Sequence, residues 1–168
     1  MTAAPPLRNP PALVRFARQH HLDLSFIEEM PLGAILEHDR AATLMESVEI
    51  RERIALHFPL TASAESTGGP SRYYRMADSD SRIGFISPHS QNFCGSCNRV
   101  RVSVQGKLLL CLGNEHAVDL RAILRGLPDN RERLLGATLA AIPVKPERHH
   151  FNLEEPPQMV RFMNMTGG

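Results

Sequence analysis

The 168-residue sequence has no tryptophan, few aromatic residues (5%) and almost no net charge, since 19 basic side chains face 18 acidic ones. This balance of positive and negative charge gives no bulk electrostatic reason to bind nucleic acid or an anionic membrane. No apolar run approaches the ~20 residues of a membrane-spanning helix. The N-terminal segment MTAAPPLRNPPAL also lacks the apolar core of a secretory signal. We therefore expect a cytoplasmic protein with no nucleic-acid partner and no membrane partner.

Cysteine and lysine are scarce as well. An odd number of cysteines, three, argues against a disulfide framework in a reducing compartment. Lys107 and Lys145 are the two lysines, and the other basic residues are arginines, a bias that genomic composition alone can cause. The remaining composition, 42% hydrophobic and 22% charged, is that of a globular chain with one domain, or one domain and a fragment of another.

The hydrophobic pattern of residues 1–60 predicts a helix over 10–21, a strand over 22–26 and a second helix over 41–58. A helix followed directly by a strand is typical of α/β proteins. The segment 61–71 is loop by composition, with Gly-Gly-Pro near its end, and we expect the main domain boundary there.

The pattern changes after this boundary. Short strands are predicted over 73–76 and 83–87, and alternating valines followed by a leucine run predict a β-hairpin over 100–110. Two helices follow, over 120–125 and 129–142. Asp119 is expected to cap the first of them, and the second carries an apolar face.

All three cysteines lie in one short segment, as Cys94-x2-Cys97-x13-Cys111. A Cys-x-x-Cys turn brings two sulfurs to one centre, and Gly95 is expected to permit the tight backbone. The hairpin that follows returns the chain, so that Cys111 reaches the same point. Three thiolates predict an iron–sulfur cluster in which one iron keeps an open position for substrate.

Three other interpretations of the cysteines stay open at this point. A structural zinc ion would need His89 or His116 as its fourth ligand. A redox-active cysteine pair leaves Cys111 unexplained and would sit at the start of a hairpin, not of a helix. The three residues could also be unrelated buried cysteines.

Two arginines follow the second cysteine. Arg99 and Arg101 are two residues apart on a predicted strand, so both side chains are expected on one face. Two guanidinium groups beside a metal centre suit the oxygens of a phosphorylated ligand. The alternative is a solvated pair on an edge strand.

These motifs together resemble a known family. The segment GFISPHSQNFCGSCNRVRVSVQGKLLLCLGNEHAVDLRAILR is similar to the C-terminal cluster region of the GTP 3′,8-cyclases of molybdenum cofactor biosynthesis, the MoaA family. Its form is G-F-I-S-P, then F-C-x-x-C-N-R-x-R, a glycine turn, the third cysteine and V-D-L-R. The terminal Gly167-Gly168 matches the family's double glycine, and LSFIEEMPLG resembles its late barrel strand.

The resemblance implies a radical S-adenosylmethionine lyase with two [4Fe–4S] clusters. In the family, the N-terminal cluster cleaves S-adenosylmethionine to a radical that takes the ribose 3′ hydrogen of GTP, and the substrate radical then attacks C8. The product, (8S)-3′,8-cyclo-7,8-dihydroguanosine 5′-triphosphate, feeds cyclic pyranopterin monophosphate synthase. The implied fold is α/β, with residues 1–60 as the last elements of a partial (β/α) barrel. Residues 61–168 would form a small α+β cluster domain.

The resemblance also implies roles for individual residues. Cys94, Cys97 and Cys111 would hold the C-terminal cluster, whose open iron binds guanine. Residues 99–101, that is Arg99, Val100 and Arg101, would contact GTP. Met30 would lie against S-adenosylmethionine, and the tail Gly167-Gly168 would reach into the active site.

Two departures from the family pattern bear on activity. Cys-x3-Cys-x2-Cys, which binds the radical-generating cluster, does not occur in the sequence, and Ser25 stands where the family usually has a triphosphate-binding arginine. We therefore expect the C-terminal part of a GTP 3′,8-cyclase that binds a cluster and GTP but is inactive alone. The alternatives are a cluster- and nucleotide-binding module that docks on a second copy or on a full-length homologue, or a zinc-stabilised domain.

Overall fold

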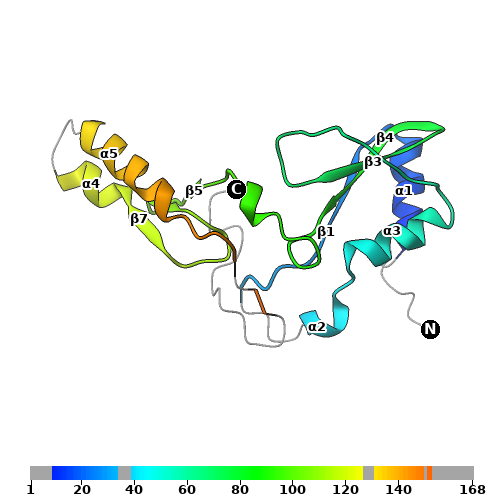
Figure 1. The fold of residues 1–168 in the computed structure, drawn as a ribbon, viewed down its shortest axis with the longest axis horizontal. Helices are drawn as coiled ribbons and strands as arrows, with labels where there is room; N and C mark the ends of the chain where they lie inside the picture. The colour runs from blue at the N-terminus through cyan, green and yellow to red at the C-terminus, as the bar shows by residue number, and fades with distance from the viewer. Residues whose placement is uncertain (1–8, 34–38, 127–130, 150, 153–168) are drawn as a thin grey trace. The chain divides into compact units, whose positions relative to one another are not determined.

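The computed structural model describes residues 9–33, 39–126, 131–149 and 151–152 (Figure 1). By its internal contacts the chain divides into two compact units. Unit 1 comprises Met1–Glu29 and Thr43–Phe93, and unit 2 comprises Met30–Ala42 and Cys94–Gly168. These units do not follow the boundary expected near residue 60, because strands on both sides of that point share one sheet. The division of the family's domains at this point stays a prediction.

Unit 1 contains a four-stranded sheet of order β1-β4-β3-β2. The pairing of β1 with β4 is parallel, with Leu24 opposite Ile83, whereas the hairpin β3–β4 and the pair β2–β3 are antiparallel. The helix expected over 10–21 and the strands expected over 22–26, 73–76 and 83–87 are confirmed within a few residues. The expectation of loop throughout 61–71 is wrong, because Thr61–Ala62 pair with the next strand of the chain. The elements are α1 (Pro10–Gln19), β1 (Leu24–Ile27), α3 (Ser47–Ala55), β2 (Thr61–Ala62), β3 (Arg72–Met76) and β4 (Ser79–Ile86).

The helix expected over 41–58 is wrong as a single element. The structure has α2 (Arg40–Thr43) and α3 (Ser47–Ala55) instead, with a break between them. The backbone N–H of Ser47 donates to the Glu28 carboxylate at 2.9 Å, which satisfies one of the donors that a helix start leaves open. This partner from the end of β1 fixes where α3 begins, and no local sequence pattern encodes it.

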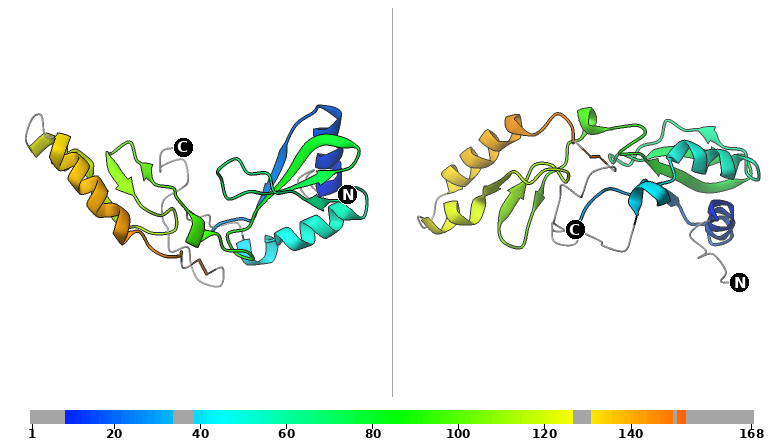
Figure 2. Two further views of the ribbon diagram at one scale, coloured as in Figure 1. Left: turned by 45° about the horizontal axis from the view of Figure 1, so that its top comes forward. Right: turned by 90° about the horizontal axis from the view of Figure 1, so that it is seen from below.

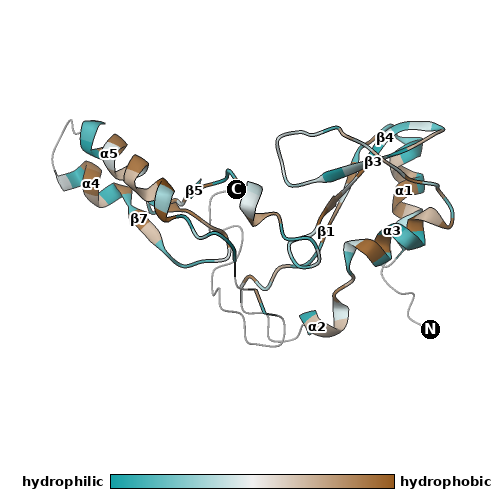
Figure 3. Ribbon diagram, in the orientation of Figure 1, coloured by the Kyte–Doolittle hydropathy of each residue, from teal (hydrophilic) through white to brown (hydrophobic). Residues whose placement is uncertain are grey.

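One face of the unit 1 sheet is covered by α1 and α3, which also contact each other. Val14, Ile54 and Ile83 are fully buried there, and Phe26 stacks on Phe85 with ring centroids 5.7 Å apart. Alternation along the strands explains this core, since every second residue of β1 and β4 points at the helices. In Figure 3, β1 is largely hydrophobic, whereas α3 carries both hydrophobic and hydrophilic residues, as expected for a helix with one face on a core.

Unit 2 contains a three-stranded antiparallel sheet, β5-β6-β7, and a pair of helices that lie side by side in each view (Figure 2). The hairpin and both helices are confirmed, and Asp119 does cap α4, because its carboxylate accepts from the Ala122 N–H at 2.8 Å. The third strand was not predicted. The elements are β5 (Arg101–Val102), β6 (Lys107–Leu109), β7 (Ala117–Asp119), α4 (Leu120–Gly126) and α5 (Arg131–Ala141).

The turn of the β5–β6 hairpin depends on a glycine. Gly106 has φ +75°, a conformation that side chains disfavour, and a Cβ there would come within 2.8 Å of the Arg121 Cβ. The N–H of Gly106 donates to the Ser103 carbonyl and the Arg121 N–H donates to the Gly106 carbonyl. The turn therefore fixes both the register of the hairpin and the position of the first turn of α4.

The core of unit 2 is small. Leu108, Leu110 and Ala141 are buried together, but the apolar face predicted for the second helix is not: Leu135 and Leu139 of α5 remain 56% and 62% exposed. The architecture as a whole is mixed α/β, as the sequence predicts. In the part of the chain that the structure describes, no helix is long and apolar enough to cross a membrane.

Candidate functional site

Cys94 and Cys97 form the Cys-x-x-Cys motif. They lie at the start of the second segment of unit 2, which also contains the sheet of that unit. Cys94 opens a short 3-10 helix (Cys94–Ser96), and the Cys97 N–H donates to the Cys94 carbonyl at 3.0 Å, which closes the expected tight turn. Gly95 is not what permits it, because its φ is not positive and a Cβ would meet nothing within 4 Å. The backbone hydrogen bond alone accounts for the turn.

The third cysteine is returned by the hairpin. Arg101 pairs with Leu109 and Val102 with Leu108, and Arg99 and Cys111 lie just beyond these pairs. Cys97 precedes β5 by four residues, and Cys111 follows β6 by two. The hairpin brings the chain back toward the segment that begins at Cys97, as expected. The meeting of all three cysteines at one point stays a prediction.

Lys145 ties these segments together. Its Nζ donates to the Cys97 Sγ at 3.5 Å, to the Arg99 carbonyl at 2.6 Å and to the Leu110 carbonyl at 3.0 Å. One ammonium group thus contacts the segment that begins at Cys97 and the residue that precedes Cys111. Sequence reasoning missed this role, and the one available signal was the rarity of lysine in the chain.

The electrostatics of the thiols agree with this proximity. Burial raises the pKa of the Cys111 thiol, and the nearby Cys94 and Cys97 raise it further. A hydrogen bond from the Gly113 N–H and the charge of Lys145 act against that rise in pKa without cancelling it. Cys111 is therefore a protonated thiol at neutral pH in the absence of metal, and ligation requires loss of its proton.

The three cysteines are the candidate ligands for a metal centre. None of the three cysteines is in a disulfide bond, and all three are half-buried. Three cysteine side chains suit an iron–sulfur cluster in chemical kind, because such clusters are held by thiolates. Across the described residues, however, no three His, Cys, Asp or Glu side chains already stand close enough to hold a single metal ion.

The two candidate histidines for zinc lie in different surroundings. His89 belongs to unit 1, where its Nε2 bonds with the Glu29 carbonyl oxygen at 2.8 Å and its backbone N–H donates to Glu28. His116 is exposed just before β7. Within unit 2, His116 and the cysteines form no metal-binding group among the described residues.

The arginines are placed less regularly than expected. Arg101 begins β5 and is half-buried, whereas Arg99 precedes the strand and is exposed. The strand therefore does not by itself set both side chains on one face, and their shared face stays a prediction. Val100 between them is 40% exposed, which leaves an apolar contact beside the cysteine turn.

The remaining predicted residues lie elsewhere or outside the description. Met30 is half-buried, and its carbonyl accepts from the Leu32 N–H at 2.8 Å in the turn after β1. Ser25 is exposed on β1, and its hydroxyl lies over Gly84, where any Cβ would collide with it. Gly167 and Gly168 lie outside the described residues.

A buried carboxylate in unit 1 was also missed. Glu28 is 2% exposed and accepts hydrogen bonds from the N–H groups of Ser47, His89 and Ser90, at 2.9, 2.9 and 3.0 Å, and from the Ser90 hydroxyl. Burial raises its pKa, but these hydrogen bonds outweigh burial and the pKa is lowered. Glu28 thus joins the chain after β1 to the chain after β4, four residues before the first cysteine.

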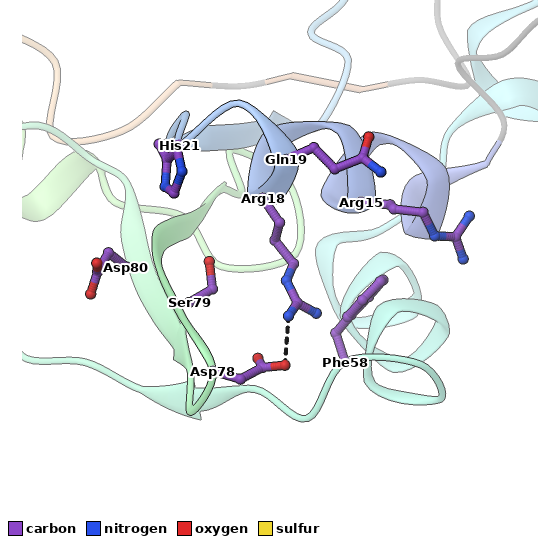
Figure 4. Close-up of a pocket in the computed structure, with 8 residues that line it drawn as sticks. All are labelled: Arg15, Arg18, Gln19, His21, Phe58, Asp78, Ser79 and Asp80. Atoms are coloured by element: carbon purple, nitrogen blue, oxygen red, sulfur yellow. Dashed lines mark hydrogen bonds and ion pairs between the residues drawn. The ribbon is translucent and has the colours of Figure 1, made fainter.

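Unit 1 also has an open cavity of about 370 Å³, which none of the predicted site residues lines. Figure 4 shows Arg18 pointing to Asp78, with which it forms an ion pair at 2.5 Å. The guanidinium of Arg18 also lies 4.9 Å from the centre of the Phe58 ring. The charges of Arg18 and Asp78 are therefore already paired with each other within the protein.

Comparison with known proteins shows the family of the chain. A family model described as Molybdenum Cofactor Synthesis C matches residues 22–151. The chain is 58% identical over 158 residues to a GTP 3′,8-cyclase of Marinobacter nauticus and 60% identical over 157 residues to that of Pseudomonas fluorescens. A Pseudomonas aeruginosa protein, GTP 3′,8-cyclase 2, is 60% identical over 156 residues.

These alignments cover nearly all of this chain but not of its relatives. They include 94% of the chain for the Marinobacter protein and 93% for the two Pseudomonas proteins, against 48%, 47% and 47% of the relatives. The chain therefore spans about half the length of these relatives, the C-terminal half. Because the family model matches more than three quarters of the sequence, including all three cysteines, the chain belongs to the Molybdenum Cofactor Synthesis C family.

Proposed function

We propose that this chain forms the cluster-bearing C-terminal part of a GTP 3′,8-cyclase, with Cys94, Cys97 and Cys111 as the thiolate ligands of a [4Fe–4S] cluster. The observation that carries the proposal is the meeting of the Cys97 segment and the chain entering Cys111 at the Lys145 ammonium. Three protein ligands leave one iron of such a cluster open, and that iron supplies a Lewis-acidic position for the guanine base when the cluster is bound.

The substrate part of the proposal concerns GTP. Arg99, Val100 and Arg101 directly follow the cysteine turn, so a base held at the cluster would leave its phosphates within reach of two guanidinium groups. The exposed Val100 offers the nucleoside an apolar contact. Charge-assisted bonds to phosphate are the strongest contribution that this surface can make to binding.

The rest of the proposal follows the family. Residues 1–60 would complete the end of a (β/α) barrel, 61–168 would form the cluster domain, and Met30 would lie against S-adenosylmethionine. Gly167 and Gly168 would enter the active site. The reaction would take place in the cytoplasm, with a second copy or a full-length homologue as partner, and its product would pass to cyclic pyranopterin monophosphate synthase. The second cluster and S-adenosylmethionine belong to the longer enzyme, because this sequence lacks Cys-x3-Cys-x2-Cys.

The test is anaerobic reconstitution of the chain with iron and sulfide, followed by titration with GTP. We expect a brown protein with absorbance near ~400 nm, and Cys111→Ser should lose most of its iron. Arg101→Ala should keep the cluster but bind GTP about tenfold more weakly, since a charge-assisted hydrogen bond contributes about 1.5–3 kcal/mol. The affinity for guanosine should change less.

Two controls make the result decisive. Val104→Ser introduces serine at an 86% exposed turn position of the same hairpin and should retain iron and GTP binding. Incubation of the wild-type chain with GTP, S-adenosylmethionine and reductant should give no 5′-deoxyadenosine. A colourless zinc-loaded protein, or full iron in Cys111→Ser, would contradict the proposed cluster.

A further inference from the structure

Lys145 occupies an unusual position in this chain. It follows the short 3-10 helix Ile142–Val144 that ends α5, it is half-buried, and prolines precede it by two positions and follow it directly. Pro143 and Pro146 each fix their own φ, which limits the paths that the backbone can take here. The lysine stem is thus directed from the end of α5 toward the cysteine hairpin.

The three hydrogen bonds of Lys145 engage all three donors of its ammonium group. Two of the acceptors are backbone carbonyls, those of Arg99 and Leu110, which belong to facing segments of the hairpin. The third acceptor is the sulfur of Cys97. The Lys145 side chain therefore links the two segments of the hairpin at the end opposite its turn, beyond the last residue pair of the strands.

We propose that Lys145 is a positioning residue for the three-cysteine site: it holds Cys97 and Cys111 toward one cluster and donates a hydrogen bond to the Cys97 sulfur. The inference rests on the proposed function, because it concerns the same cluster. Partners of this kind outside the ligand set fix ligand orientation, and their loss typically lowers metal affinity about 10–100-fold.

The charge of Lys145 has a second consequence. A [4Fe–4S] core held by three thiolates is an anion, and reduction adds one more negative charge. Hydrogen bonds to the sulfurs and nearby charge are among the factors that set cluster potentials. A cation at the Cys97 sulfur stabilises the reduced form over the oxidised one and raises the reduction potential of this cluster.

The same geometry argues against a different role for Lys145, as a ligand of the GTP phosphates. Its three donors already point at Cys97, Arg99 and Leu110, so a phosphate would have to displace one of these bonds. Loss of the lysine should therefore change the cluster more than it changes phosphate binding.

The experiment compares Lys145→Met with Lys107→Met, which alters the other lysine of the chain, on the exposed side of β6 in the same sheet. Both variants are reconstituted with iron and sulfide. Iron retention against a chelator and the midpoint potential are then measured by absorbance and by EPR-monitored titration. Lys145→Met should lose iron about tenfold faster than Lys107→Met, and its potential should shift to a more negative value. The affinity for GTP per loaded cluster should stay within twofold.

Lys145→Arg keeps the charge and so separates charge from shape. It should restore the potential, but not the full iron retention, because a planar guanidinium does not reach three acceptors in the same way. A second readout needs no metal: trypsin should cut the unloaded Lys145→Met chain after Arg99 faster than it cuts Lys107→Met, since the Arg99 carbonyl loses its partner.

The outcomes separate the two proposals. Equal iron retention, potential and cleavage in Lys145→Met and Lys107→Met would overturn the role of Lys145 while leaving the cluster assignment intact. A large drop in GTP affinity with an unchanged potential would assign Lys145 to the substrate instead. A wild-type chain that binds no cluster would overturn the proposed function itself, and with it this inference.

Discussion

The two units differ in how they are held together. Unit 1 buries side chains from α1, α3 and three strands in one core, with Val14, Ile54 and Ile83 fully buried. Unit 2 buries Leu108, Leu110 and Ala141 and leaves large apolar side chains of α5 exposed. Hydrophobic burial accounts for the order of unit 1, whereas in unit 2 hydrogen bonds to one ammonium supplement a small core. A bound cluster would add its binding free energy to unit 2 selectively.

The largest expected effect is a cavity in unit 1. Ile54→Ala removes a fully buried side chain at the contact of α3 with the sheet and should cost roughly 2–5 kcal/mol of unfolding free energy. The matched change in unit 2, Leu139→Ala at a 62% exposed position, should stay within about 0.5 kcal/mol. Urea denaturation followed by circular dichroism measures both variants. Equal losses would refute the contrast between the two cores.

The next effect concerns the buried carboxylate of unit 1. Glu28→Gln replaces one carboxylate oxygen by an NH2 group. Because each of the two oxygens accepts from at least one backbone N–H, at least one buried donor loses its acceptor in either orientation of the amide. We expect a loss of roughly 2–4 kcal/mol. Glu29→Gln, the same change at the adjacent half-buried residue, is the control and should cost less than half of that.

The pH dependence of unit 1 follows from the same group. Because the pKa of Glu28 is lowered in the folded chain, its contribution to stability is complete above the ordinary carboxyl pKa of about 4.3 and is lost as pH falls through the lowered folded value. Glu28→Gln should therefore flatten the acid side of the stability profile. A wild-type stability that rises on acidification below pH ~4 would contradict the assigned direction.

The smallest expected effect is at the exposed edge of unit 1. Arg82 donates to Asp23 through its Nε at 2.9 Å and its Nη2 at 2.5 Å, and these bonds lower the pKa of Asp23. Since both side chains are partly exposed, Asp23→Asn should cost less than about 1 kcal/mol, and the loss should shrink in high salt. Thermal unfolding at two salt concentrations measures this. A loss as large as that of Ile54→Ala would show that charge, not burial, dominates unit 1.

Local patterns in the sequence were enough to predict most elements. The helix beginning at Pro10, the β5–β6 hairpin and the Asp119 cap follow from periodicity, turn residues and capping preferences, each within a few residues. The cysteine spacing was also readable, because Cys94 and Cys97 are closed by a local turn and Cys111 is returned by a local hairpin. These features depend on neighbours in the sequence.

What the sequence did not reveal depends on distant partners. The break before α3 is fixed by Glu28, nineteen residues away, and the lysine at the cysteine hairpin lies 48 residues from Cys97. β7 exists because β6 offers an unpaired edge that Ala117–Asp119 can join, although three residues have no periodicity of their own. The expected need for glycine at position 95 was also wrong, although here the partners are local. The turn there requires no backbone conformation that a side chain would disfavour.

The register of the β5–β6 hairpin limits how many residues can separate Cys97 from Cys111. Arg101 pairs with Leu109, and Gly106 holds the turn between the strands. One extra residue in either strand would slide the pairing by one position and carry the third thiol to the other face of the sheet. One residue added to each strand would preserve the pairing at the open end. Related chains should therefore lengthen or shorten this segment by even numbers of residues, so that insertions and deletions here are counted in pairs.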